Sequence, residues 1–269
     1  MEGLNVMAEW IVVTGLEGAL LNLADEGSGA DEEPMKRAIA QLKAKGVPVI
    51  VFTDSDRAEV EPIRERLGLV SPFITESGSG IFTPVNQNPF AVLLGEKEGE
   101  YYVEVLGCPY VQARAGLRVM ANLIAHPLKG FGDFTVPQLE KAMQLSEAAA
   151  HRAKDREFSE PFMTPKAVDA AVLRQTAEEI GFGLLLRRPD AGRFSVMMGP
   201  EAGLEPAVQR VIAVYQQQLS EDETLKVLGL SAQADELAVL AIACSSAEWT
   251  GRVVAGPFDW LAAVAPLLA

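Results

Sequence analysis

Short apolar runs alternate along the first part of this chain with stretches in which apolar residues recur every three or four positions. The runs 11–14, 47–52 and 73–75 are typical of buried strands. The helical spacing between them predicts helices over 32–46 and 58–67. Because strands that alternate with helices usually pair in parallel, we expect an α/β fold with a doubly wound parallel sheet.

The pattern changes beyond residue 84 and changes back near residue 191. The middle region mixes helices with short strands, which is typical of an α+β insert. We therefore predict a Rossmann-like core domain of residues 1–84 and 191–269 and an inserted α+β cap domain of residues 85–190. The further predicted strands are 100–106, one near 162, 184–186, 194–198 and 225–228. The further predicted helices are 110–125, 136–154, 166–180, 205–219, 234–243 and one around 258–261.

Composition and net charge argue against some classes of binding partner. The 269 residues are 49% hydrophobic and carry a formal net charge of −14. A chain this acidic is a poor match for nucleic acid or an anionic membrane, which bind clustered Lys and Arg. The sequence shows neither a secretory signal nor an apolar run of about 20 residues, so we expect a soluble, cytoplasmic protein. Cys108 and Cys244 lie in apolar surroundings and are expected to be buried thiols that form neither a disulfide nor a zinc site.

The first predicted strand ends in a turn that carries Gly15, Glu17 and Gly18. In open α/β sheets, ligands bind at the carboxyl ends of the strands, so this turn is a candidate functional position. The segment 10–21 resembles the first motif of the haloacid-dehalogenase (HAD) superfamily, in which an apolar strand precedes Asp-x-Asp-Gly-Thr-Leu. The resemblance puts Gly15 at the nucleophile position, which is thereby lost. It puts Glu17 at the acid/base position and Ala19 at the Thr position.

Later segments resemble the mannosyl-3-phosphoglycerate phosphatase branch of this superfamily. Residues 76–78 read Glu-Ser-Gly where the branch typically has Glu-Asn-Gly, and residues 156–162 read Arg-Glu-Phe-Ser-Glu-Pro-Phe. A third similarity is Gly-Arg-Phe at 192–194. The resemblance covers most of the chain in order, and it implies a HAD core with a cap.

The resemblance also implies a chemistry against which this chain can be compared. The branch forms a phospho-aspartyl intermediate, binds the phosphoryl group with Ser/Thr and Lys, and holds Mg²⁺ with Asp. Thr53 matches the phosphate-binding hydroxyl, whereas the Lys position falls on Ala202. The metal motif Gly-Asp-Ser-x-Asn-Asp corresponds to Gly-Leu-Ser-Ala-Gln-Ala over 229–234.

The residues that the resemblance assigns to ligand binding are largely present. Arginines that converge on a cleft bind phosphate or carboxylate, although ion pairing between domains is the alternative for each of them. Thr53 equally suits a turn cap, Asp54 and Asp56 suit the N-terminus of the next helix, and 187–188 suits a solvated strand end. The candidate ligand-binding residues are Thr53, Ser77, Gly78, Arg156, Glu160 and Arg193.

Three functional hypotheses follow. The first is a phosphatase-like pseudoenzyme without a cofactor, which binds a phosphorylated small molecule or a protein partner. The second is an active phosphosugar phosphatase whose rebuilt site holds a metal through Glu17, Asp54, Asp56 and Asp235. The third is a non-catalytic assembly protein with no ligand pocket. The sequence leaves the ligand, the partner and the oligomeric state open.

Overall fold

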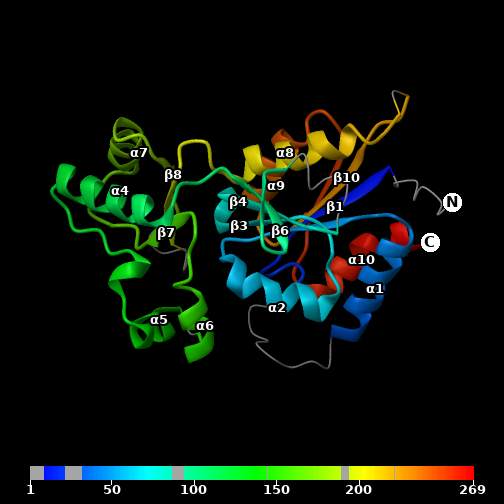
Figure 1. The fold of residues 1–269 in the computed structure, drawn as a ribbon, viewed down its shortest axis with the longest axis horizontal. Helices are drawn as coiled ribbons and strands as arrows, with labels where there is room; N and C mark the ends of the chain where they lie inside the picture. Colours follow the sequence, from blue (N-terminus) through cyan, green and yellow to red (C-terminus); the bar gives the residue numbers. More distant parts are fainter. Residues whose placement is uncertain (1–8, 22–31, 87–93, 144, 189–193, 221) are drawn as a thin grey trace.

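The computed structural model describes residues 9–21, 32–86, 94–143, 145–188, 194–220 and 222–269. Its main feature is an eight-stranded sheet with the strand order β11-β10-β1-β2-β3-β4-β6-β5 (Figure 1). The first five strands in this order are parallel, and β4, β6 and β5 continue the sheet in antiparallel fashion. The strands are β1 (Trp10–Gly15), β2 (Val49–Phe52), β3 (Phe73–Thr75), β4 (Gly80–Pro84), β5 (Glu96–Glu98), β6 (Tyr101–Val105), β10 (Lys226–Ser231) and β11 (Glu248–Val253).

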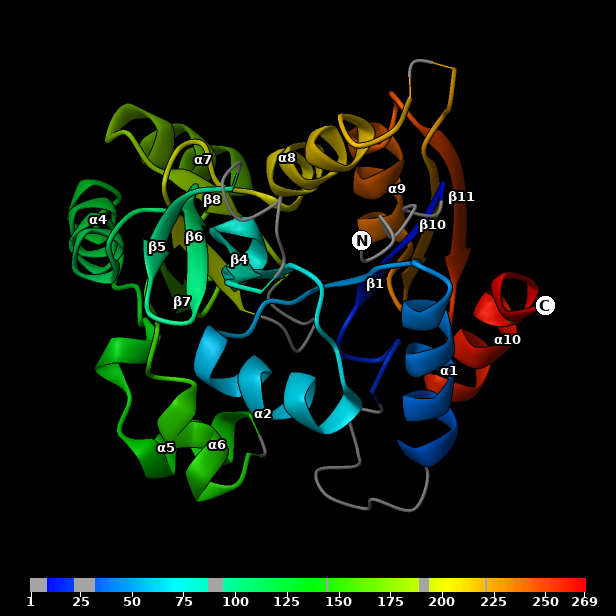
Figure 2. The ribbon, with the colours of Figure 1, turned by 45° about the vertical axis from the view of Figure 1, so that its right-hand side comes forward.

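Helices cover both faces of this sheet because side chains alternate between the faces along each buried strand. Val12 and Val51 pack on one side with α1 (Glu32–Ala44), α2 (Arg57–Leu67) and α10 (Pro257–Leu268). Ile11, Val13 and Ile50 pack on the other side with α8 (Leu204–Gln216) and α9 (Ala234–Ala243). Figure 2 shows the two helical layers on opposite sides of the strands. The sheet is therefore doubly wound, as the alternating pattern predicted.

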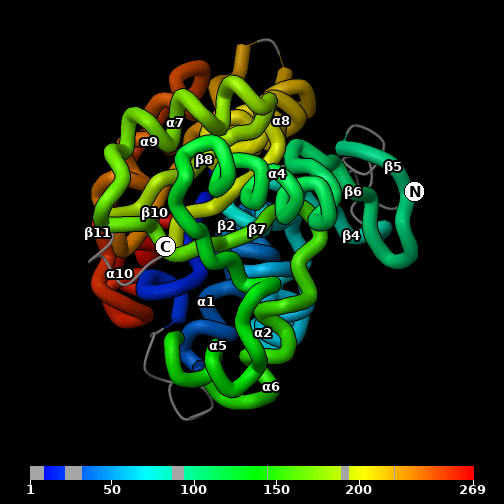
Figure 3. The backbone as a smooth tube through the Cα atoms, turned by 90° about the vertical axis from the view of Figure 1, so that its left-hand side faces the viewer, coloured from blue at the N-terminus to red at the C-terminus, as the bar shows by residue number. Residues whose placement is uncertain are grey.

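A second, smaller sheet has the antiparallel order β7-β9-β8. Its strands are β7 (Ser159–Phe162), β8 (Gly183–Leu185) and β9 (Ser195–Met198). Apolar side chains of α4 (Tyr110–Leu123) and α7 (Ala170–Glu179) pack against this sheet. Figure 3 looks onto these helices and onto α5 (Val136–Met143) and α6 (Glu147–Arg152), which lie at the left in Figure 1, away from α10. The prediction of an α/β core with an α+β cap is confirmed.

Several elements differ from the sequence prediction. The helix predicted over 136–154 is two helices, because the Ser146 side chain accepts the Ala149 N–H and starts a new helix, α6. The strands β4, β5 and β11 were not predicted. The two domain boundaries stay a prediction; β6 pairs with the core strand β4, β5 pairs with β6, and β9 pairs within the small sheet. No helix in the described part of the chain is long and apolar enough to cross a membrane.

Candidate functional site

The candidate site lies where β1, β2 and β10 end and the following turns begin. Gly15 is the last residue of β1 and pairs with Phe52 of β2. A Cβ atom added to Gly15 would lie 3.4 Å from Cζ of Phe52 and 3.7 Å from Oγ of Ser231. The position therefore faces an aromatic ring and a hydroxyl group. Leu230, on the neighbouring strand, is fully buried in the apolar core.

Thr14 cannot replace the missing side chain of Gly15, because adjacent strand residues point to opposite faces. The Thr14 hydroxyl instead accepts the indole N–H of Trp260 at 3.1 Å, on the face covered by α10. The Thr14 side chain is fully buried there. The strand end at Gly15 thus presents no nucleophilic oxygen of its own.

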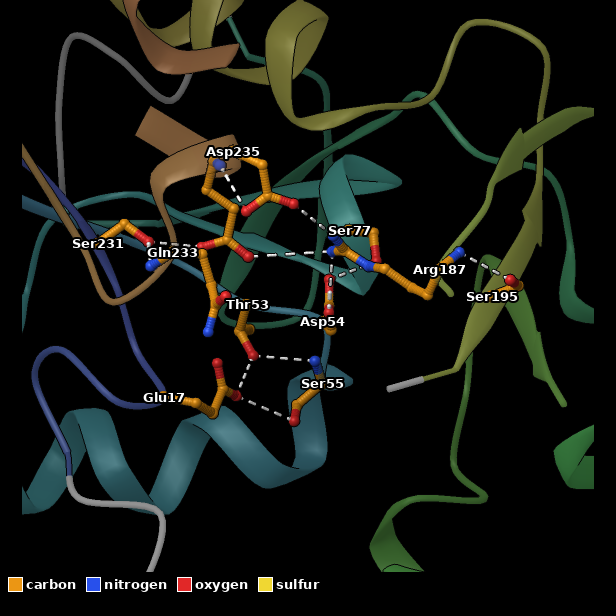
Figure 4. A network of polar contacts seen from close by, with 11 residues as sticks. Glu17, Thr53, Asp54, Ser55, Ser77, Arg187, Ser195, Ser231, Gln233 and Asp235 are labelled. Carbon is orange, nitrogen blue, oxygen red and sulfur yellow. Dashed lines mark hydrogen bonds and ion pairs between the residues drawn. The ribbon is translucent and has the colours of Figure 1, made fainter. Parts of the chain in front are cut away.

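Glu17 occupies the turn after β1 and belongs to a small hydrogen-bonded group. Its Oε1 accepts hydrogen bonds from the Thr53 hydroxyl and, at 3.2 Å, from the Ser55 hydroxyl (Figure 4). The side chain is accessible to solvent, yet protein surrounds it on most sides, and this desolvation raises the pKa of the Glu17 carboxyl above its usual value. The two hydroxyl donors oppose that increase, and Asp54 adds to it.

Thr53 serves as a turn cap as well as a partner of Glu17. Its Oγ1 accepts the Ser55 N–H at 2.9 Å, and only 3% of the residue is exposed. Asp56, three residues later, caps α2 by accepting the Glu59 N–H at 3.1 Å, as its sequence position predicted. Both side chains therefore have structural roles at the end of β2, which fits the capping alternative for each.

The positively charged side chain of Arg187 enters the site from the side of the small sheet. Arg187 follows β8, and its guanidinium lies 3.3 Å from Asp54, 3.6 Å from Asp235 and 3.9 Å from Glu236. Figure 4 shows this side chain reaching between Asp54 and Asp235. Its backbone N–H is fixed by Ser195 Oγ of β9 at 2.9 Å. The expectation that Arg187 lies at a solvated strand end is wrong, since only 12% of its side chain is exposed.

Hydroxyl groups orient the carboxylates around Arg187. The Ser77 hydroxyl donates to Asp54 Oδ1 at 2.7 Å, and the Ser231 hydroxyl donates to Glu236 Oε2 at 2.6 Å. Sequence reasoning selected Ser77, assigned Arg187 to a solvated strand end and did not select Glu236. The two arginines that follow the apolar run 184–186 carry no signal that distinguishes a surface position from a contact between distant segments.

A cavity of about 380 Å³ adjoins this ion-pair group. It opens between the ends of the core strands and the small sheet, and Thr53, Ser77 and Gly78 contribute to its wall as the sequence predicted for ligand contact. The wall consists of Phe52, Thr53, Asp54, Ser77, Gly78, Leu185, Leu186, Arg187, Met198, Gly203, Leu204, Glu205, Pro206, Asp235, Glu236 and Val239.

The residues present do not fit a magnesium site. Mg²⁺ requires several oxygen ligands at about 2.0–2.1 Å in octahedral geometry, whereas Gly15 and Leu230 supply no side-chain oxygen. Asp54 and Asp235 are instead paired with a guanidinium. In the part of the chain that the structure describes, no three His, Cys, Asp or Glu side chains are grouped so that they could hold a metal ion.

The predicted Lys position is also apolar. Ala202 packs at the edge of the α8 core cluster, and its N–H donates to the Gly199 carbonyl at 3.2 Å. The next residue, Gly203, is in close contact with Gly78, because a Cβ on Gly78 would lie 2.2 Å from the Gly203 carbonyl carbon. This contact brings the turn after β3 against the start of α8 and closes one wall of the cavity.

The two remaining candidates in the cap do not reach the cavity. Arg156 lies 3.8 Å from the buried carboxylate of Glu76, and its Nη1 donates to Ser159 Oγ at 3.4 Å. Glu160 is fully buried and accepts the Gly132 N–H at 3.0 Å. The contact of Arg156 fits the ion-pairing alternative, and the contact of Glu160 fits a structural role. The remaining ligand-binding candidate, Arg193, lies outside the described residues.

Relatives of known function share extended similarity with this chain. No family model matches it. A glucosyl-3-phosphoglycerate/mannosyl-3-phosphoglycerate phosphatase from Persephonella marina is 32% identical over 211 residues, which are 78% of this chain and 74% of the relative. A mannosyl-3-phosphoglycerate phosphatase from Pyrococcus furiosus is 38% identical over 130 residues, or 48% of this chain and 52% of the relative.

Solved structures agree with the fold. A HAD-superfamily phosphatase from Bacteroides thetaiotaomicron has a TM-score of 0.58 at 10% identity, with 94% of this chain and 92% of the other covered. A HAD-like hydrolase from B. subtilis has a TM-score of 0.55 at 14% identity, with 86% of each chain covered. Identities this low support the fold alone. Together with the extended identity to the first relative, they show that this chain belongs to the HAD superfamily and is related to its mannosyl-3-phosphoglycerate phosphatases.

Proposed function

We propose that this chain is a non-catalytic member of the phosphatase family, in which the space between core and cap serves ligand binding. The observation that carries the proposal is Gly15 at the end of β1, whose missing side chain would face the Phe52 ring. Covalent phosphoryl transfer requires an attacking oxygen at a defined position, and glycine supplies none.

The surroundings of Gly15 support the same proposal. A transferring phosphoryl group develops negative charge that cations must neutralise. Ala202 provides no ammonium group, and the sequence contains no Lys between Lys166 and Lys226. The guanidinium of Arg187 is already shared among carboxylates. Glu17 alone keeps a chemically competent group, and an acid without a nucleophile does not complete the reaction.

The cavity supports a binding role over a purely structural one. An assembly protein has no need of an internal pocket between core and cap, whereas small-molecule sites are concave and mostly apolar with a few polar groups. The cavity of about 380 Å³ has this composition and falls within the usual range of ligand pockets.

A phosphatase assay tests the proposal. The purified protein is incubated with 4-nitrophenyl phosphate and with mannosyl-3-phosphoglycerate, with and without Mg²⁺. We expect phosphate release equal to that of buffer. The Glu17→Gln variant is the matched control for contamination, because a trace contaminant is unaffected by it. Mg²⁺-dependent turnover that disappears in Glu17→Gln would overturn the proposal.

A further inference from the structure

We propose that two copies of this chain associate through β11, the strand at one end of the eight-stranded sheet, and form a two-fold dimer with one continuous sheet. The proposal goes beyond the proposed function, because it assigns a partner to the edge of the core, and that partner is a second copy of this chain. Its basis is the order of side chains along β11, which is self-complementary in one antiparallel register.

One row of backbone groups on β11 faces away from the sheet. In the described part of the chain, β11 ends the strand order and pairs with β10 alone. The N–H groups of Glu248 and Val254 donate to carbonyl oxygens on the side of β10, at 2.8 and 3.0 Å. Since backbone groups alternate in direction along a strand, those of Trp249, Gly251 and Val253 point outward. An edge strand with such a row can pair with a further strand.

One antiparallel register suits both the backbone and the side chains of β11. Outward groups must face outward groups, so odd-numbered residues oppose odd-numbered ones. A two-fold axis at Thr250 fulfils this condition, and Trp249 of each copy then exchanges hydrogen bonds with Gly251 of the other. The same axis places the exposed Glu248 of each copy opposite the exposed Arg252 of the other. Opposing side chains are closest at such non-hydrogen-bonded positions, so two ion pairs stabilise the dimer.

The opposite end of the sheet disfavours the same kind of association. The edge strand β5 has three residues, which read Glu-Lys-Glu over 96–98. Every antiparallel pairing of this strand with itself sets Glu against Glu and Lys against Lys, and like charges directly opposite each other are destabilising. Short, charged strands are a common protection of sheet edges. Like charges therefore exclude a second copy at β5, whereas opposite charges admit it at β11.

Exposed apolar side chains lie on β11 and on the helices beside it. Val253 of β11 is 59% exposed, Ile242 of α9 is 57% exposed and Phe258 of α10 is 84% exposed. Figure 2 shows β11 as the outermost strand, with α9 on one side of the sheet and α10 on the other. Apolar groups gathered in one region of a surface mark an interaction site. A second copy on β11 lies next to all three elements and removes apolar surface from water.

The helices beside β11 lack the charged outer face of an ordinary surface helix. Beyond its first turn α9 has no charged residue, and the only charged residue of α10 is Asp259. By contrast α1, which covers the same face of the sheet as α10, exposes Glu33, Arg37 and Lys43. A helix without a polar face is normally covered by protein. The composition of α9 and α10 thus suits an interface between two copies.

Sedimentation velocity of the full chain tests the proposal over a wide range of protein concentrations. We expect a dimer. Arg252→Glu should raise its dissociation constant at least about tenfold, because both ion pairs become contacts between like charges. Circular dichroism establishes that the variant is folded. An unmodified chain that stays monomeric, or a dimer that Arg252→Glu leaves unchanged, would overturn the proposal.

Exchanging the charges tests the register itself. Glu248→Arg alone should weaken the dimer as Arg252→Glu does, whereas the double variant with both substitutions should associate like the unmodified chain. Mixing the two single variants should produce a mixed dimer, because each carboxylate of one then meets a guanidinium of the other. If neither the double variant nor the mixture recovers the dimer, the register centred on Thr250 is wrong.

Leu123→Asp is the matched control on another exposed surface. Leu123 is 61% exposed on α4, which packs on the small sheet, so this variant should leave the dissociation constant unchanged. Loss of the dimer in Leu123→Asp, with Arg252→Glu still dimeric, would assign the association to α4 instead. Hydrogen exchange gives a second measurement: the amides of residues 248–253 should exchange more slowly in the dimer than in monomeric Arg252→Glu. Equal exchange in this segment would contradict pairing through β11.

Discussion

At the end of β1, one missing side chain changes what the whole strand end can do. Gly15 leaves the ring of Phe52 in the place toward which a longer residue would point. The backbone of Gly15 pairs in parallel register with Phe52, so the strand forms without a side chain at this position. The pairing of the strand tolerates any side chain that fits here, because its hydrogen bonds use only backbone atoms.

An aspartate introduced at position 15 should not make the protein catalytically active. Gly15→Asp places a carboxylate beside the Phe52 ring, with no Lys at Ala202 and no carboxylate at Leu230. We expect no Mg²⁺-dependent hydrolysis of 4-nitrophenyl phosphate, and a free energy of unfolding about 1–3 kcal/mol lower, measured in urea. Gly15→Ala is the control and should be close to the unmodified protein, because a methyl group fits at 3.4 Å. Turnover in Gly15→Asp alone would contradict the prediction.

Glu59, in the first turn of α2, gives a residue-level prediction on pH. Burial, helped by the nearby Asp56, raises the pKa of its carboxyl from 4.5 to about 7, and Arg152 and Arg156 oppose the increase. Because the folded pKa lies above the unfolded one, the folded state binds the proton more tightly. Stability from this group is therefore complete at low pH and is lost as pH rises from 4.5 to about 7.

Replacing Glu59 with Gln should remove the loss of folding stability that occurs as the pH rises. Glu59→Gln should raise the free energy of unfolding by about 1–3 kcal/mol near pH 8, after allowance for partial exposure. Near pH 4 it should have little effect. Urea unfolding at the two pH values measures the difference, with the exposed Glu65→Gln on the same helix as control. A gain that is equal at both pH values would contradict the assigned cause.

At the scale of elements, two glycines end segments in the same backbone conformation but in different surroundings. Gly68 caps α2 with φ of +72° and has open space around its added Cβ. Gly78 follows β3 with φ of +91°, and its added Cβ would overlap Gly203 at the start of α8. The first glycine is required for its conformation alone, whereas the second also permits two elements to touch.

This contrast predicts unequal costs for the same substitution. Gly68→Ala should lower the free energy of unfolding by about 1 kcal/mol, which is the strain of a left-handed alanine. Gly78→Ala should cost at least about 3 kcal/mol, because the backbone of Gly203 must move as well. Thermal and urea unfolding of both variants measure the difference. Equal costs would show that the turn after β3 yields easily to the added methyl group.

Local sequence signals predicted some of the helices and strands correctly and missed others. The strand over 73–75 and the helix over 234–243 were predicted with the bounds that the structure gives, because a buried apolar run and a clear helical period are local signals. The strand β11 was missed because it is an edge strand with mostly exposed residues, so it lacks an apolar pattern. The break between α5 and α6 depends on one hydroxyl cap at Ser146.

The candidate site was predictable only where a resemblance or a strand end marked it. Thr53, Ser77 and Gly78 fall in recognisable turns and do line the cavity. Arg187 could not be found in this way, because its partners Asp54 and Asp235 are distant in sequence and meet it only through the packing of core and cap. A contact between core and cap produces no periodic pattern in the sequence.

For the whole molecule, polar contacts join core and cap at several places in the described part of the chain, among them the ion pair between Arg57 and Glu157 at 2.9 Å. Glu76, which is fully buried, accepts the Glu157 N–H at 2.8 Å and the Ser159 hydroxyl at 2.6 Å. Arg187 joins the small sheet to the ends of the core strands through Asp54 and Asp235. The Glu76 contact uses backbone and hydroxyl donors and is buried, whereas the Arg187 contact consists of ion pairs and a hydrogen bond to Asp54 and lies beside the cavity.

Reversing the charge at Arg187 should therefore move core and cap apart without unfolding either of them. Arg187→Glu brings a further carboxylate to Asp54, Asp235 and Glu236, and like charges at ion-pair distance repel by roughly 1–4 kcal/mol per pair. We expect a larger radius of gyration by small-angle scattering, with the Glu76 contact still holding the layers together. Arg188→Glu makes the same charge change at an exposed neighbour and should leave the radius unchanged. An unchanged radius in both variants would mean that Glu76 and the apolar packing fix the position of the cap, and that Arg187 responds to this position instead of maintaining it.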